Sequence, residues 1–157
     1  MKPGRIGVPA LCAGVVLGAA LLAAPAQTAS VDRHLAADMS GLKEVTAKGK
    51  KAAGDKDGRG AGVFDFSGSK MCFGLTVHGI AKPTAAHIHK APTGKAGPVV
   101  VALVAPSAGN PGASSGCVSV KPATASAIRK NPSAYYVNVH TADYPDGAVR
   151  GQLKVLR

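Results

Sequence analysis

The chain has 157 residues, with no tryptophan, 3 tyrosines and 3 phenylalanines, so its apolar content suits one domain with a modest core. Its 19 basic residues outnumber the 8 acidic ones, which gives a formal net charge of +11. That charge favours an anionic partner. The main basic stretch has no aromatic side chains on which bases could stack, so we expect no nucleic acid among the partners.

Residues 1–26 have the layout of a secretory signal peptide. Lys2 and Arg5 precede an uncharged apolar run, and Ala24-Pro25-Ala26 supplies small residues for cleavage. We expect cleavage after Ala26 and a secreted or cell-envelope, extracellular protein with no membrane span after cleavage. An uncleaved anchor is the alternative, because about 19 apolar residues suffice to cross a bilayer. The mature chain keeps 17 basic and 8 acidic residues, a net charge of +9.

Three cysteines are present, and Cys12 would leave with the signal peptide. Cys72 and Cys117 then remain as a pair in an oxidising compartment, which predicts a disulfide bond. Closing a loop of this length stabilises a fold by about 4 kcal/mol on the chain-entropy estimate. Two free buried thiols are the alternative.

The first part of the mature chain is polar. Residues 27–37 are expected to form a tether, and the β domain is expected over residues 38–157, with a first strand at 38–45. Residues 46–60 are rich in Lys, Gly and Asp and predict a long solvated loop that does not pack. The basic side chains in this region also suit attraction to an anionic envelope polymer or an extracellular protein: Lys43, Lys48, Lys50, Lys51, Lys56 and Arg59.

Period-two alternation of apolar and polar residues begins at residue 62. Residues 62–66 and 71–78 alternate on either side of Ser67-Gly68-Ser69, which predicts a β-hairpin. A strand over 84–90 follows. The aliphatic run 98–104 predicts a strand buried on both faces, and residues 117–120 predict another short strand.

The only helical candidate is residues 123–130, which ends before Asn131-Pro132 and must dock on the sheet through Ile128. Residues 134–140 and 148–156 flank the turn signal Tyr144-Pro145-Asp146-Gly147 and predict a second hairpin. These elements together predict an all-β domain, an antiparallel Greek-key sandwich or flattened barrel, with one short helix.

Four histidines fall inside three of the predicted strands. His87 and His89 are two positions apart, so a strand places both imidazoles on one face. His140 lies on another strand, and we expect all three to converge if the strands are neighbours, with His78 as a possible fourth member. Imidazoles on rigid strands suit copper or zinc.

The alternative is a polar cluster without metal. Tyr136, Asn138 and His140 share one face of the strand 134–140, while Tyr135, Val137 and Val139 point inward. Together with Arg150, the polar residues would then satisfy one another by hydrogen bonding and specify the strand register.

Catalytic groups are missing around these histidines. No carboxylate accompanies them in sequence, and the chain has neither a Gly-x-Ser-x-Gly elbow nor a glycine-rich phosphate loop. We therefore expect no enzymatic activity, and a binding or structural module instead.

Four blocks of the sequence resemble the CHRD domain, a module named from chordin. They are AHIHKAP at 86–92, GPVVVAL at 97–103, NPSAYYVNVHT at 131–141 and GAVRGQL at 147–153. The resemblance covers about residues 38–156. It implies an all-β sandwich of the immunoglobulin-like or superoxide-dismutase-like kind, an extracellular setting and no established catalytic activity.

The His87-Ile88-His89 strand and the later strand ending in Val139-His140 also resemble the copper-ligand strands of copper/zinc superoxide dismutase. The acidic zinc loop of that enzyme, with its additional histidines, has no counterpart between His89 and His140. We treat the likeness as one of architecture and do not expect dismutase chemistry.

Overall fold

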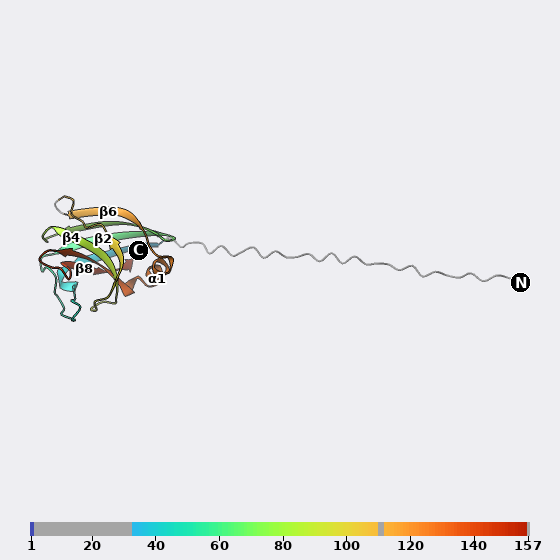
Figure 1. The fold of residues 1–157 in the computed structure, drawn as a ribbon, viewed down its shortest axis with the longest axis horizontal. Helices are drawn as coiled ribbons and strands as arrows, with labels where there is room; N and C mark the ends of the chain where they lie inside the picture. Colours follow the sequence, from blue (N-terminus) through green and yellow to red (C-terminus); the bar gives the residue numbers. More distant parts are fainter. Residues whose placement is uncertain (2–32, 110–111, 157) are drawn as a thin grey trace.

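The computed structural model describes residues 1, 33–109 and 112–156. In these residues, antiparallel strands form a 9-stranded sheet with the order β5-β4-β7-β8-β1-β2-β3-β6, and β9 also pairs with β1. The sheet curls into a nearly closed barrel (Figure 1). The strands are β1 (Arg33–Ser40), β2 (Arg59–Ser67), β3 (Lys70–His78), β4 (Pro83–Lys90), β5 (Val99–Leu103), β6 (Gly112–Ser119), β7 (Tyr135–Thr141), β8 (Val149–Gln152) and β9 (Lys154–Val155).

The core fills the inside of the barrel because alternate residues of each strand are apolar. On β3, Met71, Phe73, Leu75 and Val77 are all buried, as the alternation predicts. The predicted all-β fold with one short helix is confirmed. Both predicted hairpins are present as well: β2 pairs with β3, and β7 pairs with β8.

The α-helix α1 (Pro122–Lys130) lies at one end of the barrel (Figure 1). Proline occupies its first turn, where a missing N–H has no cost, and the helix ends before Asn131-Pro132. Ile128 is fully buried, so the helix docks through the predicted residue. Arg129 Nη1 also donates to Gly68 O in the β2–β3 turn at 2.6 Å. Short 3₁₀ helices η1 (Gly41–Lys43) and η2 (Pro132–Ala134) complete the described elements.

The prediction for the aliphatic run 98–104 is wrong in one respect. β5 stands at the end of the strand order, and only Val101 of its five residues is buried, while Val99 is 51% exposed. A hollow of about 550 Å³ lies between β5 and the end of β6. An aliphatic run alone does not distinguish a central strand from an edge strand, because β-branched residues favour both.

The N-terminal boundaries also differ from those expected. β1 begins at Arg33, so the predicted tether is wrong for residues 33–37, and the first strand is shifted from the expected 38–45. The alternation of buried residues starts at Leu35, whose apolar neighbours Ala36 and Ala37 weaken the pattern. The predicted signal peptide, residues 1–26, lies outside the described residues apart from Met1.

Residues 46–60 match the prediction of a solvated loop only in part: 47–52 are exposed, whereas Gly54 and Gly58 are buried. Val45 and Lys51 form a bridge, and Asp55 N donates to Ala148 O at 2.8 Å. Gly54 is buried so close to the sheet that a Cβ at this position would lie 2.4 Å from Ala148 O. Glycines let this polar segment approach the sheet closely, and its lysine side chains point outward and remain exposed.

The predicted disulfide Cys72–Cys117 is confirmed. Its two residues pair directly across β3 and β6, on the outer face of the barrel. Among the residues that the structure describes, no helix has the length and apolar character needed to cross a membrane.

Candidate metal centre

Two neighbouring strands carry the histidines. β4 and β7 pair so that His87 faces Asn138, His89 faces Tyr136 and Ala85 faces His140. Residues paired across an antiparallel ladder share a face. The opposite face of these strands supplies core residues such as Ile88 and Val137, so the imidazoles lie on the outer face of the barrel.

The structure brings together His87, His89 and His140. One nitrogen from each ring lies within 4.8 Å of the others, and His87 Nδ1 is 3.1 Å from His140 Nε2. Metal–nitrogen bonds of about 2.0–2.1 Å place ligand nitrogens roughly 3.4 Å apart. Small rotamer shifts of about 1 Å therefore suffice to bring the three nitrogens to one ion.

Backbone carbonyls orient two of the three rings. His89 Nδ1–H donates to Gly97 O at 2.8 Å, and His140 Nδ1–H donates to Pro145 O at 2.9 Å. A carbonyl oxygen only accepts, so each Nδ1 carries the proton and each Nε2 of the neutral ring carries the lone pair; that of His140 faces His87 Nδ1 at 3.1 Å. Metal-binding histidines usually show this arrangement, in which the ring nitrogen that does not bind the metal donates a hydrogen bond to an oxygen.

His89 Nε2 is the most informative atom of the cluster. It is buried and has no hydrogen-bond partner among the described residues. Buried polar atoms are nearly always paired, so an unpartnered lone pair beside two other imidazoles is a candidate position for a bound ion. A metal ion would satisfy it.

Aromatic and cationic side chains support the cluster from β7 and β8. The Tyr136 ring stacks on His89 with centroids 4.8 Å apart and an interplanar angle of 7°. The Arg150 guanidinium lies over the same tyrosine ring, 3.4 Å from its centroid. The side-chain amide of Asn138 lies 3.1 Å from His140 Nε2, and only its NH2 group can donate to that unprotonated nitrogen. These contacts limit the freedom of His89 and His140.

The surroundings keep two of the imidazoles neutral. Burial lowers the pKa of His87, and the neighbouring His140 and His89 lower it further by charge repulsion. Burial also lowers the pKa of His89, although the hydrogen bond to Gly97 opposes this shift. Burial raises the pKa of Tyr136, so its hydroxyl stays protonated. The cluster therefore offers neutral nitrogen donors.

A buried carboxylate that sequence reasoning missed lies close to this cluster. Glu44 is 1% exposed; its Oε1 accepts from Val45 N at 2.9 Å, and its Oε2 has no partner among the described residues. Burial is the main cause that raises its pKa, while Arg150 and Asn138 lower it. Glu44 is the only glutamate in the chain, and this is the one signal in the sequence that distinguishes it.

Gly147 belongs to the turn that orients His140, and it lies against Glu44. Its φ is +139°, and a Cβ there would lie 2.1 Å from Glu44 Oε2. The glycine thus permits contact between this turn and the buried carboxylate.

The remaining predicted residues lie elsewhere or act in support. His78 is exposed at the end of β3, pairs in register with Arg59 and is not a member of the histidine group. Cys72 and Cys117 belong to the disulfide and take no part in the site. Tyr136, Asn138 and Arg150 all surround the histidines, on the face that the alternation assigns to them.

The fold and the site define an antiparallel β-barrel module with a partly buried cluster of three histidines on its outer surface. The family model described as CHRD domain matches residues 35–153, and the chain belongs to the CHRD domain family. The predicted resemblance is therefore confirmed. No curated protein and no solved structure matches the chain.

Proposed function

We propose that this protein is an extracellular, non-enzymatic CHRD module that binds one copper or zinc ion through His87, His89 and His140. The observation that carries the proposal is the buried, unpartnered Nε2 of His89 beside the other two imidazoles. The carbonyl contacts of His89 and His140 support it, because they fix the tautomers in which Nε2 carries the lone pair.

The donor set indicates the class of metal. Three neutral imidazoles suit borderline ions such as Cu²⁺ and Zn²⁺, whereas Mg²⁺ and Ca²⁺ prefer oxygen donors. Three protein ligands leave at least one coordination position for water or another molecule. The residues present fit such an ion. When bound, it would supply a Lewis-acidic centre on the surface of the barrel.

Calorimetric titration of the untagged, metal-free protein tests the proposal. We expect one site per chain with a dissociation constant of about 1 μM or tighter, about −8 kcal/mol. His89→Ala should abolish it, because it removes the most buried ligand. His78→Ala is the matched control, since it also removes a strand-borne imidazole but one outside the cluster. Circular dichroism verifies that both variants fold.

Two results would contradict the proposal. One is a wild-type titration without saturable binding of either metal. The other is a stoichiometry that the His89→Ala change leaves at one ion per chain while the variant stays folded.

The exposed basic side chains favour a second function, association with an anionic envelope polymer. Every lysine between residues 43 and 56 is exposed, and Arg59 is exposed as well. Part of the segment that carries them is anchored to the body of the domain, where Gly41 N donates to Gly58 O and Asp55 N donates to Ala148 O. The grouping of these side chains in one segment concentrates positive charge on the surface. We propose that the same module adheres through this surface while the histidine cluster holds its metal.

A further inference from the structure

A cleft of about 420 Å³ opens beside the histidine cluster, on the same outer face of the barrel. This volume is within the range of small-molecule sites. Its walls come from β1, η1, η2, β8, β9 and the loop that follows β4. The lining residues are Asp38, Lys43, Thr93, Gly94, Ser133, Arg150, Gln152, Leu153 and Lys154.

The wall of this cleft includes a buried cation with spare donor capacity. Arg150 is 2% exposed, and its Nη2 donates to Pro92 O at 3.1 Å. Its Nη1 has no hydrogen-bond partner among the described residues. A guanidinium has five N–H donors, and a buried charge needs partners for them. Burial lowers the pKa of Arg150, although Tyr136 and Glu44 oppose the shift.

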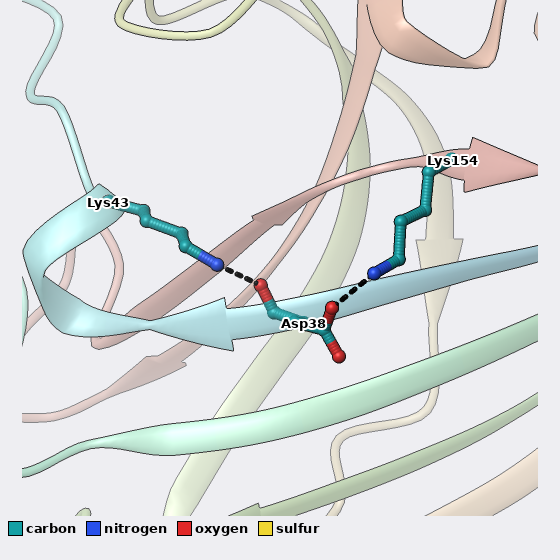
Figure 2. A network of polar contacts seen from close by, with 3 residues as sticks. All are labelled: Asp38, Lys43 and Lys154. Carbon is teal, nitrogen blue, oxygen red and sulfur yellow. Dashed lines mark hydrogen bonds and ion pairs between the residues drawn. The ribbon is translucent and has the colours of Figure 1, made fainter.

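Two lysines and one aspartate of the lining form the network of polar contacts drawn in Figure 2. Lys43 Nζ donates to the backbone carbonyl of Asp38 at 2.7 Å, and Lys154 forms an ion pair with the Asp38 carboxylate. That ion pair is the main cause that lowers the pKa of Asp38. Both partners are more than half exposed, so the pair contributes little to stability, and Lys154 is free to exchange partners.

The lining of the cleft therefore carries more positive than negative charge. Three cations, Lys43, Lys154 and Arg150, face one carboxylate, Asp38. Neutral hydroxyl groups of Thr93 and Ser133 complete the wall. An excess of positive charge in a concave site of this size is the setting that recognises a small anion.

We propose that this cleft binds one oxyanion, a carboxylate or phosphate group carried by a small polar molecule. Arg150 and the two rim lysines supply the charge, and the wall hydroxyls bind neighbouring polar groups. Lys154 turns from Asp38 to the ligand on binding. Asp38 competes with the ligand for this lysine and limits the affinity.

Calorimetry on the full mature chain in low-salt, phosphate-free buffer tests the proposal, with inorganic phosphate and galacturonate as probes and neutral galactose as the control. We expect saturable binding of one equivalent of at least one anion, and none of galactose. Saturation by phosphate alone assigns the ligand as free phosphate, and saturation by galacturonate alone assigns it as a sugar carboxylate. Failure of both anions to saturate overturns the proposal.

Matched variants separate a built site from general charge attraction. The double change Lys43→Gln and Lys154→Gln should weaken binding about tenfold, about 1.4 kcal/mol. Lys48→Gln with Lys50→Gln removes the same charge from exposed positions outside the cleft and should change the affinity less than about twofold. Equal weakening by both doubles overturns the proposal.

A substitution at Asp38 should change the anion affinity in the opposite direction. Asp38→Asn removes the competing carboxylate and should raise the affinity several-fold, whereas Asp57→Asn, which makes the same charge change outside the cleft, should not. An unchanged affinity in Asp38→Asn counts against the site. None of these variants alters a histidine, so metal binding should be retained in all of them, and the two functions succeed or fail separately.

Discussion

Glu44 shows how one residue from a polar segment connects to a distant site. Its carboxylate is buried beside Gly147 and is influenced by Asn138 and Arg150, both of which contact the residues around the histidines. Buried carboxylates are costly when ionised unless their oxygens are paired. Because Oε2 has no partner among the described residues, ionisation of Glu44 costs free energy and lowers the stability of the fold.

The raised pKa of Glu44 predicts how stability depends on pH. The folded protein holds this proton more tightly than the unfolded chain, whose carboxyl has an ordinary pKa near 4.5. Wild-type stability should therefore fall relative to Glu44→Gln as the pH rises from about 4.5 through the folded-state pKa. Urea unfolding of both proteins across this range measures the difference.

Asp38→Asn is a control for which we expect the pH dependence of stability to have the opposite sign. Lys154 lowers the pKa of Asp38 in the folded protein, so wild-type stability should rise relative to Asp38→Asn as the pH increases toward 3.8. A stability difference between wild type and Glu44→Gln that stays constant above pH 4.5 would show that Glu44 ionises as easily as in the unfolded chain.

At the scale of elements, the disulfide secures an edge of the sheet. β6 stands at the end of the strand order and pairs only with β3, to which Cys117 and Cys72 join it. Replacing both cysteines by serine should lower the free energy of unfolding by about 4 kcal/mol, because the unfolded chain regains the freedom of a long loop. Urea unfolding under oxidising conditions measures this loss.

Adding reductant tests whether the cross-link itself causes this loss of stability. Reductant should destabilise the wild type by a similar amount and leave the double serine variant unchanged. A wild type that reductant does not destabilise would show that the cross-link contributes nothing to the fold.

Strand positions were predictable where apolar and polar residues alternate. The β2–β3 hairpin follows from Phe64, Phe66 and the alternating residues of β3, and its turn follows from Gly68, whose φ is +59°. β5 shows the limit of such patterns. Its aliphatic run predicts a strand, but the position of that strand in the sheet depends on pairing between distant segments, which no local pattern contains.

The residues of the site also divide into those that a local pattern predicts and those that depend on contacts between distant segments. The spacing of His87 and His89 predicts a shared face, and His140 joins them only because β4 and β7 are neighbours. The carbonyl contacts come from loops, where Gly97 and Pro145 have no side-chain signal of their role. The buried carboxylate of Glu44 lies against Gly147, a close approach between distant segments that composition alone does not reveal.

For the whole molecule, the net charge predicts salt-dependent adhesion. Retention on anionic cell-wall polymer should weaken as ionic strength rises, because the screening length falls from about 10 Å at 0.1 M salt to about 3 Å at 1 M. The triple change Lys48→Gln, Lys50→Gln and Lys51→Gln should lower the salt concentration needed for elution.

A triple change at Lys70, Lys121 and Lys130 removes the same charge from exposed positions elsewhere in the chain and should lower that concentration less. If the two triple variants elute together, the segment 43–59 has no special part in adhesion. Elution that ignores ionic strength would reject an electrostatic attachment altogether.

The Cys72–Cys117 bond also decides how mechanical load passes through the protein. When the chain is pulled from its two ends, tension crosses the sulfur–sulfur bond and bypasses the residues between the cysteines. β4 and β5 lie in this sheltered segment, together with His87 and His89, whereas His140 lies outside it. A module stretched between two anchors would therefore carry the load on the strands outside this segment, and the His-x-His strand itself would not be drawn out.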